Sequence, residues 1–524
     1  MIKQIKRAII SVSDKTQILT LAKTLYQYNI EILSTEGTAT VLKNANIPVI
    51  KISDYTEFPE MMGGRIKTLH PKIHAGLLGQ SNSSDMLMKQ YGIKPIDLVI
   101  VNLYPFKKTI ELKNTTTEEI IESIDIGGVT ILRSAAKNYH NVTAVCSPDD
   151  YVNFIHELKK NNGQTNLESR FKFACKAFSY TAHYEDSIAN YFSGFSLQTQ
   201  KSTTKFPKTI NFQLHQVCRM RYGENPHQKS ALYTNTSMNQ KCIFNMKQLQ
   251  GGRLSYNNIV DADIASKCIK MFNKPSCVIV KHGNPCGIAC SNTIKQAYID
   301  AFNSDSISAF GGIIACNRQL DETLAEIIIQ KFIEIIIIPK ITKSALKIFS
   351  RKPSIRILIY SNNISLQQDA AFEFKTVNRG VLLQEQDNVS PSLDKFQVVT
   401  IRNPSDQELD DLEFAWKAVK YVKSNAIVYA KDNRTLGVGS GQTNRILSAK
   451  IAIELAKAAK LETVGAVMAS DAFLPFEDIV NFVCSKGITA IIQPGGSIRD
   501  QAIVDSANKN NIAMIFTGTR HFKH

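Results

Sequence analysis

The chain has 524 residues, more than a single hydrophobic core usually supports, so we expect two or more domains. Hydrophobic residues make up 44% and charged residues 21% of the chain, which is an ordinary globular composition. The formal net charge of +16 suggests nucleic acid as a partner, but the Lys and Arg residues are spread along the whole chain, which argues against a nucleic-acid-binding protein. Anionic small substrates explain the charge at least as well, and a general drift of the composition towards Lys is a third explanation.

Ten cysteines lie mostly inside apolar runs without a regular spacing, so we expect reduced thiols. The first residues pass directly into a strand-like run and show no signal-peptide pattern. The longest apolar segment, 327–338, is interrupted by Gln330, Lys331 and Glu334 and is not expected to span a bilayer. These features predict a soluble, cytoplasmic protein without a membrane partner.

Short apolar strands alternate with amphipathic helices from the start of the chain to about residue 193. We expect strands at 8–12, 30–33, 49–52, 97–101 and 142–146, and helices at 15–28 and 38–44. This alternation is typical of a parallel α/β sheet.

Two polar turns, 11–16 and 34–38, follow the first two strands, and each opens a helix. Backbone N–H groups and the helix dipole at such points bind phosphate. Helix capping alone would also explain Ser13, Asp14 and Thr38. Two such turns in one domain favour a phosphate pocket.

Residues 63–76 combine an arginine, two lysines, two histidines and three glycines, which are poor material for a core. His70 and His74 have the spacing of a metal pair on one helical face, but Pro71 argues against a regular helix there. An anion-binding loop is the favoured interpretation. Further along, Lys137 is either a solvated helical lysine or a catalytic one, and composition does not separate the two.

The Ser/Thr/Lys-rich segment 194–209 is the best linker candidate. The segment 340–394 is the least patterned part of the chain and is expected to connect two subdomains. From about residue 397 the α/β alternation returns. Here we expect a helix at 416–424, a strand at 426–429, a glycine-rich segment at 437–445 that opens a helix, and an apolar run at 512–516 that ties the C-terminus into a sheet.

A buried strand is expected at 277–280, and it ends at Lys281 and His282. The glycines, Asn284 and Pro285 that follow are expected to force a turn. In open α/β sheets the ligand lies beyond the carboxyl ends of the strands, so these two bases are expected at the mouth of a cleft. Histidine titrates near neutrality, which suits proton transfer at an amine. The alternative is a surface turn that contains two bases by chance.

Ten segments of the chain, taken in order, resemble a bifunctional purine-biosynthesis family. It joins a phosphoribosylaminoimidazole-carboxamide (AICAR) formyltransferase to an IMP cyclohydrolase. The segments are SVSDKT, GGRIKTLHPKIHAG, NLYPF, DIGGVTILRSAAKN, RYGENPHQ, KHGNPCG, SNAIVYAK, SDAFLPFED, QPGGS and TGTRHFKH. The resemblance covers nearly the whole chain, and the ordered set is far more specific than any single motif.

The resemblance implies an α/β fold with two domains. Residues 1–198 would form a methylglyoxal-synthase-like parallel sheet that closes formyl-AICAR to IMP with loss of water. Residues 206–524 would form two cytidine-deaminase-like subdomains that move the formyl group of 10-formyltetrahydrofolate to the AICAR amine. The resemblance also implies a homodimer that shares the formyl-transfer site, with folate as co-substrate and no catalytic metal.

For the cyclohydrolase, the resemblance implies that Lys137 donates and accepts the proton, assisted by Lys67, Tyr104 and Asp125. Ring closure needs a nucleophilic carboxamide nitrogen, a polarised carbonyl and a proton for the departing water, which Lys and Tyr donors can serve. The family usually has Gly where this chain has Glu36, and a carboxylate there would repel the expected phosphate unless it points away. The residues expected around the nucleotide are Ser13, Asp14, Lys15, Thr35, Glu36, Gly37, Thr38, Arg65, Ile66, Lys67, Thr68, Val101, Asn102, Asp125 and Ile126.

For formyl transfer, the resemblance implies that His282 is the general base and acid and that Lys281 stabilises the oxyanion of the tetrahedral intermediate. The residues expected around AICAR are Arg221, Tyr222, Gly311, Glu334, Asn425, Arg445, Phe473 and Arg520. Those expected against the folate are Ile446, Asp478, Ser497 and Ile498. The zinc deaminases need H-x-E and P-C-x-x-C, whereas here no Glu follows His282 and the spacing of Cys286 and Cys290 is wrong. Deamination is therefore disfavoured.

Two other hypotheses remain open at this point. One is a nucleic-acid-binding protein that uses the net charge of +16. The other is that the N-terminal domain has drifted into a phosphate-binding or dimerisation module, because of the carboxylate at Glu36.

Overall fold

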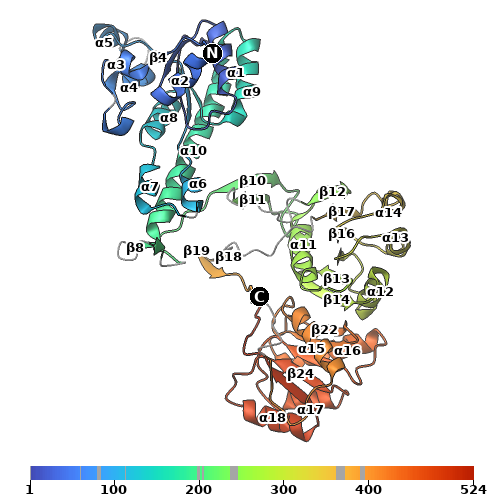
Figure 1. Ribbon diagram of the computed structural model, residues 1–524. Coiled ribbons are helices and arrows are strands. Elements are labelled where there is room, and N and C mark those ends of the chain that lie inside the picture. The colour runs from blue at the N-terminus through green and yellow to red at the C-terminus, as the bar shows by residue number, and fades with distance from the viewer. Residues whose placement is uncertain are drawn as a thin grey trace. The chain divides into compact units, whose positions relative to one another are not determined.

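The computed structural model of the protein describes residues 2–59, 61–79, 84–112, 114–196, 201–202, 206–235, 246–360, 372–389 and 396–524. The chain divides into two compact units, residues 1–214 and residues 215–524, and Figure 1 labels their helices and strands. Within the described ranges, every helix is too short or too polar to pass through a lipid bilayer.

The first unit is built on a five-stranded parallel sheet, which confirms the sheet expected from the alternation of strands and helices. The strands lie in the order β4-β3-β2-β5-β6. Their bounds are β2 Arg7–Val12, β3 Glu31–Ser34, β4 Ile50–Lys51, β5 Leu98–Asn102 and β6 Thr143–Val145. Two short strands, β1 (Ile2–Gln4) and β7 (Gln164–Asn166), pair antiparallel beside it.

Helices cover both faces of this sheet, because residues 8–10 of β2 and 98–101 of β5 are apolar and buried. Ile9 of β2 packs into one core cluster and its neighbour Ile10 into the cluster on the other face. The Ile10 cluster includes residues of α1 (Ile18–Gln27) and α9 (Tyr151–Lys160). The Ile9 cluster includes residues of α4 (Pro71–Leu78), α8 (Gly127–Lys137) and α10 (Leu167–Ser193) (Figure 1). The other helices are α2 Glu36–Asn44, α3 Ile52–Thr56, α5 Ser84–Gln90, α6 Phe106–Glu111 and α7 Thr117–Glu122, with single 3-10 turns at Met62–Gly64 and Pro148–Asp150.

Two expectations for this unit are wrong. The strand expected at 49–52 shrinks to the two residues of β4, because the chain turns into α3 at Ile52. Pro71 does not prevent a helix: α4 begins at Pro71 itself, where the missing N–H costs no helical hydrogen bond. His70 caps this helix, since its Nδ1 accepts the backbone N–H of Lys72 at 3.1 Å.

The second unit contains a twelve-stranded sheet made of two halves with the same order of elements. Each half has an edge strand, a helix, a hairpin and then three helix–strand repeats. The first half is β12 Lys247–Gln250, α11 Tyr256–Ile269, β13 Ser276–Lys281, β14 Asn284–Cys290, α12 Ile294–Ser304, β15 Ile313–Cys316, α13 Glu322–Ile328, β16 Ile335–Ile338, α14 Lys343–Phe349 and β17 Arg356–Ile359. The second half is β20 Gln397–Val398, α15 Asp406–Val419, β21 Ile427–Lys431, β22 Arg434–Gly439, α16 Arg445–Ala458, β23 Val467–Ser470, α17 Asp478–Cys484, β24 Ala490–Gln493, α18 Asp500–Lys509 and β25 Ala513–Phe516.

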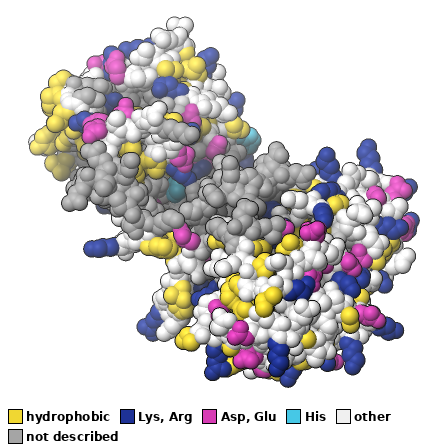
Figure 2. Space-filling view, turned by 60° about the horizontal axis from the view of Figure 1, so that its bottom comes forward, with side chains coloured by type: hydrophobic (Ala, Val, Ile, Leu, Met, Phe, Trp, Pro, Cys, Tyr) yellow, Lys and Arg dark blue, Asp and Glu magenta, His cyan; other side chains and the backbone are white. Residues whose placement is uncertain are grey.

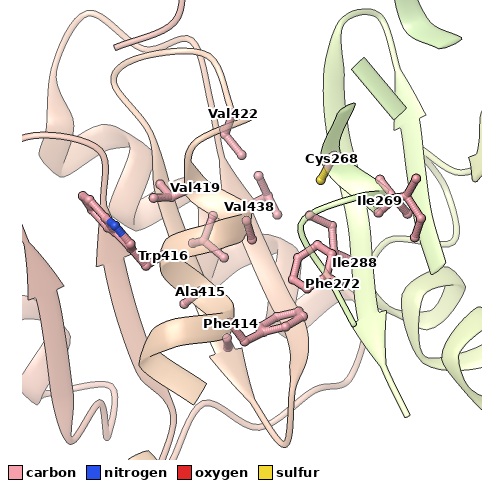
Figure 3. Packing of buried hydrophobic residues seen from close by; sticks show 14 of the residues in the cluster. Cys268, Ile269, Phe272, Ile288, Phe414, Ala415, Trp416, Val419, Val422 and Val438 are labelled. Carbon is pink, nitrogen blue, oxygen red and sulfur yellow. The ribbon is translucent and has the colours of Figure 1, made fainter. Parts of the chain in front are cut away.

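The strand order is symmetric about the contact between the two hairpins. It reads β12-β17-β16-β15-β13-β14 and then β22-β21-β23-β24-β25-β20. The halves share one hydrophobic core, in which buried side chains of α15 lie beside those of the first half (Figure 3). The rings of Phe272 and Phe414, one from each half, are 5.4 Å apart. Since α11 and α15 bury their apolar faces in the same cluster, we infer that the halves fold together.

Three expectations for this unit need correction. Residues 343–359 of the expected connector form α14 and β17 inside the sheet. The helix expected at 416–424 is α15, which begins ten residues earlier because Ser405 and Glu408 form a capping box. In the glycine-rich segment, Gly437 and Gly439 belong to β22, where a Cβ would collide with carbonyl oxygens of α16.

Among the described residues, three further antiparallel strand pairs lie outside the two sheets. They are β8 (Phe195–Ser196) with β9 (Lys201–Ser202), β10 (Leu214–Arg219) with β11 (Ala231–Asn235), and β18 (Phe372–Val377) with β19 (Gly380–Glu385). The first of them falls in the segment expected as a linker. The other parts of the expected connector, 361–371 and 390–394, lie outside the described residues. The apolar run expected to tie in the C-terminus is β25, which confirms that expectation.

Candidate active sites

The hairpin that carries Lys281 and His282 is tighter than the sequence suggests. β13 ends at Lys281 and β14 begins at Asn284, so the turn consists only of His282 and Gly283, with φ angles of 52° and 77°. Pro285 therefore belongs to a strand, not to the turn. β13 is also antiparallel to both of its neighbours, so the rule for open parallel sheets does not apply to it.

The Asp261 carboxylate of α11 holds this turn. It accepts the backbone N–H of His282 at 3.1 Å and that of Gly283 at 2.6 Å. Burial raises the pKa of Asp261, while these two N–H groups and the His282 side chain pull in the opposite direction. Lys281 is fixed as well, because its Nζ donates to the backbone oxygen of Phe310 at 2.6 Å. The His282 side chain itself is exposed in the single chain.

The antiparallel pairing brings further expected residues to the same edge of the sheet. Val280, near the carboxyl end of β13, pairs with Ile313 at the amino end of β15, and Ile313 pairs with Ile335 at the amino end of β16. Gly311 precedes β15 and Glu334 precedes β16, so both lie at the edge that carries the Lys281 hairpin. The Glu334 carboxylate accepts the side-chain amide of Asn258 on α11 at 2.7 Å.

The second half contributes to this edge through the loop before β21. The backbone N–H of Lys423 donates to the side-chain oxygen of Asn284 at 2.9 Å, which joins this loop to the hairpin. Asn425 accepts from the Arg445 guanidinium at 2.8 Å. Arg445 in turn forms an ion pair with Asp471, and both side chains are almost fully buried. The Arg445 guanidinium, which was expected to bind AICAR, therefore already bonds Asn425 and Asp471.

The remaining residues expected in the second half follow the carboxyl ends of β22, β23, β24 and β25. These ends share the edge, because β23 runs antiparallel to β21 while β24 and β25 run parallel to β23. The Phe473 side chain is 39% exposed and that of Ile498 fully exposed, so both are available for stacking or apolar contact. The Arg520 guanidinium lies 4.5 Å from the centre of the Phe522 ring. The residues placed in this way are Ile446, Phe473, Asp478, Ser497, Ile498 and Arg520.

Arg221 and Tyr222 lie outside the large sheet, in the loop after β10, with the guanidinium 5.5 Å from the ring centre. This loop reaches the start of α11, because the side chain of Asn257 donates to the backbone oxygen of Glu224 at 3.3 Å. It is thereby placed beside the helix turn that holds Glu334.

In the first unit, Asn102 organises the carboxyl edge of the parallel sheet. Its buried side-chain oxygen accepts the backbone N–H groups of Ser13 at 2.6 Å and Asp14 at 2.8 Å. The Thr38 hydroxyl bonds both backbone groups of Val12, at 3.2 and 3.3 Å. These polar side chains shape the two turns, while Asp14, Lys15 and Gly37 are exposed at the start of α1 and α2. Val101 is buried in the core beside them.

Glu36 is directed towards a lysine of β4. Its carboxylate accepts a hydrogen bond from Lys51 Nζ at 2.8 Å. This bond lowers the pKa of Glu36, and the positive charges of Lys43 and Lys67 act in the same direction. The carboxylate that would repel a phosphate is thus paired with a cation. Thr35, the residue before it, is buried and shares a hydrogen bond of 3.1 Å with Ser11.

A second group of expected residues gathers around Asp125. Its carboxylate accepts the backbone N–H of Gly128 at 2.7 Å. Burial raises the pKa of Asp125, while the backbone N–H groups of Gly128 and Tyr104 and the charge of Lys67 oppose this rise. Thr68 contacts the start of α8 so closely that a Cβ at Gly127 would collide with its hydroxyl. Arg65 pairs with Glu122, Ile66 is half-buried, and the Ile126 side chain is exposed.

Lys137 lies at the opposite end of α8 from Asp125. Asp125 lies just before the first residue of α8, whereas Lys137 is its last residue and is exposed. Ten residues of helix separate the two ends, a rise of about 15 Å. A lysine side chain does not span this rise, so Lys137 does not bond the Asp125 carboxylate directly.

The residues considered for a metal have other partners. His74 Nδ1 lies 3.0 Å from the Ser134 hydroxyl, and His70 caps α4. Burial raises the pKa of Cys286 to about 12 and that of Cys290 to about 11, which keeps both as thiols. Among the described residues, no three His, Cys, Asp or Glu side chains are arranged to hold a metal ion.

Two acids, the half-buried Asp261 and the fully buried Asp471, are missing from the residues expected on sequence grounds. Asp261 lies in the middle of α11, where nothing local in the sequence distinguishes it. Asp471 had a signal, since it is an acid placed directly after the apolar strand β23.

On the face seen in Figure 2, Lys and Arg side chains are scattered among acidic and apolar ones and form no continuous basic stripe.

Comparisons with known proteins match two family models along the chain. Residues 135–455 match a family model described as the AICARFT/IMPCHase bienzyme, and residues 17–130 match one described as an MGS-like domain. A solved structure titled "Crystal structure of ForH" is 34% identical over 36% of this chain and 96% of its own chain, with a TM-score of 0.33.

Proposed function

Because the chain belongs to the AICARFT/IMPCHase bienzyme family, we propose that its second unit carries formyl transfer and its first unit ring closure. The protein is an enzyme of purine biosynthesis with these two activities: it formylates AICAR and cyclises the product to IMP. The sites, the donor and the assembly are proposals. They rest on the two groups of residues described above.

In the formyl-transfer site, the donor is 10-formyltetrahydrofolate. The AICAR amine attacks the formyl carbon, and His282 accepts the proton that the amine releases. The tetrahedral intermediate then collapses, the bond from the formyl carbon to folate N10 breaks, and N10 leaves with its electron pair and takes a proton. Formyl-AICAR and tetrahydrofolate are the products.

Lys281 stabilises the oxyanion of that intermediate. Its ammonium carries three N–H donors, and one of them is committed to the Phe310 carbonyl at 2.6 Å. The bond fixes the position of the charge before the reaction begins, and a fixed charge needs no reorganisation as the oxyanion forms. Phe473 provides a surface for stacking on a flat imidazole, and Arg520 a cation for the phosphate.

A homodimer completes this site. In a single chain the His282 side chain is exposed, whereas proton transfer at an amine is favoured where water is excluded. A second copy that covers the edge of the sheet would provide that exclusion. Reduced thiols support a cytoplasmic location, since all the described cysteines are unpaired and most of them are buried.

In the ring-closure site, the phosphate of formyl-AICAR lies against the turns before α1 and α2, where backbone N–H groups gather. Proton transfer in ring closure is carried out by Lys67, Tyr104 and Asp125. Burial raises the pKa of Asp125, which suits a carboxyl group that gives and takes a proton. Lys137 is the donor implied by the resemblance, but its distance from this group favours Lys67 in that role.

One observation supports the proposal for formyl transfer: the strand directions put residues of several separated segments along the edge of the sheet that carries the Lys281–His282 turn. The test replaces His282 by Asn, which tolerates the left-handed backbone of the turn, and measures the two steps separately. We expect formyl transfer to fall by about 10²–10⁴-fold, with closure of supplied formyl-AICAR unchanged.

The control is Asp432→Asn. Asp432 occupies the equivalent turn of the second half, with a φ of 53°, and is followed by Asn433 with a φ of 55°. We expect normal formyl transfer in this variant. Normal transfer in His282→Asn as well would show that His282 is not the base.

A further inference from the structure

The two halves of the second unit contain the same acid-held turn, and only one of the two turns carries a histidine. Asp261 accepts the N–H groups of His282 and Gly283 at 3.1 and 2.6 Å. Asp411 accepts those of Asp432 and Asn433 at 3.1 and 2.7 Å. Each acid lies six residues after the serine that caps its helix, Ser255 in α11 and Ser405 in α15.

The lysine before each turn is held in the same way. Lys281 Nζ donates to the Phe310 oxygen at 2.6 Å, and Lys431 Nζ to the Val464 oxygen at 2.9 Å. The residue after each carbonyl is a glycine with positive φ, 73° at Gly311 and 76° at Gly465. The acid, the turn and the lysine therefore form a repeated structural unit, and the second copy shows what this unit does without a histidine.

Each turn is stabilised by its acid, because three of the four residues in the two turns are non-glycine residues with an unfavourable backbone conformation. His282 and both residues of the second turn are left-handed non-glycine residues. Two N–H groups that point to the same side require acceptors, and one carboxylate provides both. The direction of the Cα–Cβ bond of His282 follows from this backbone, so the carboxylate determines where the imidazole can lie.

We propose that Asp261 is a positioning residue for formyl transfer, which aims the His282 imidazole at the AICAR amine by fixing the left-handed turn. The proposal rests on the function assigned above to His282. Asp411 performs the same structural task at a turn without a catalytic side chain.

The test compares Asp261→Asn with Asp411→Asn in the full chain. In each variant an amide replaces the carboxylate, so one of the two N–H groups loses its acceptor. We expect Asp261→Asn to lower kcat of formyl transfer by about tenfold or more, because small misplacements of a catalytic group are costly. The KM for AICAR should change little. We expect Asp411→Asn to keep kcat within about twofold, while both variants lose similar thermal stability.

Equal kcat values in the two variants would overturn the proposal. If Asp261→Asn does not fold, Asp261→Glu replaces it: the charge remains but its oxygens move by one methylene, and the same loss of kcat is expected. A full rate in Asp261→Glu would again contradict the proposal. Closure of formyl-AICAR by the first unit measures the amount of active protein in every sample.

The variant His282→Asn distinguishes the proposed role of His282 as the base from the proposed positioning role of Asp261. If it retains formyl transfer, the proposed function of this site fails. If it loses formyl transfer while Asp261→Asn does not, only the positioning role fails. In the double variant we expect no further loss beyond that of His282→Asn, since Asp261 acts through the imidazole.

Discussion

The contribution of the buried ion pair between Arg445 and Asp471 to the stability of the second unit can be measured. The exposed fraction is 6% for the Arg445 side chain and 0% for Asp471. The acid also accepts the backbone N–H of Ala426 at 3.1 Å, and the guanidinium also holds Asn425. Asp471→Asn removes the negative charge and leaves the guanidinium buried without a counter-ion. A change of this kind destabilises a protein by about 3–5 kcal/mol.

The chain contains a single tryptophan, Trp416, which is buried in α15 of the second unit. Its fluorescence during urea unfolding therefore reports on this unit alone. With a slope of about 3 kcal/mol per M, a loss of 3–5 kcal/mol lowers the midpoint by about 1–1.7 M urea. The rate of formyl transfer should fall too, because Asp471 no longer fixes the Arg445 guanidinium that holds Asn425.

The control is Glu326→Ala. Its ion pair with Arg351 lies in the same unit, with side chains 64% and 49% exposed, and exposed pairs contribute about 0–1 kcal/mol. A midpoint shift in Asp471→Asn no larger than that in Glu326→Ala would refute the reasoning about the buried pair.

Three further predictions concern single lysine and glutamate side chains. Lys67→Met should slow the closure of formyl-AICAR by about 10²-fold or more, and Lys137→Met by less than about threefold; the reverse order in a stopped-flow assay would restore Lys137 as the donor. Glu36→Gly should change the KM for formyl-AICAR by less than about twofold, because Lys51 already pairs with the exposed carboxylate; a large gain in activity would support drift of the first unit. Glu408 is partly buried, which raises its pKa, but hydrogen bonds led by that from Arg402 outweigh this and lower the pKa to about 2. Its contribution to stability is thus present above the unfolded pKa of about 4.3 and is lost as pH falls towards 2. In an acid titration followed by Trp416 fluorescence, Glu408→Gln should therefore make the loss of stability between these two pH values less steep. An unchanged pH dependence would contradict the assignment.

Local pattern was sufficient for four of the five strands of the parallel sheet and for the family. β2, β3, β5 and β6 each contain a short apolar run, as is typical of strands buried on both faces of a sheet. Ordered motifs such as KHGNPCG and TGTRHFKH were sufficient to indicate the family. Neither kind of signal depends on how distant segments are arranged.

Only the tertiary structure decided which of these residues meet. β13 pairs antiparallel with β15, which is distant in the sequence, and this reversal brings Gly311 and Glu334 to the end of the strand that carries Lys281. The same applies to Asp261 and Asp471, whose partners lie 21 to 47 residues away. Helix geometry in turn separates Lys137 from Asp125, although only eleven residues lie between them in the sequence. Residue identity determined the chemistry of this chain, whereas strand direction and helix rise determined which groups can act together, because these distances are properties of the folded backbone.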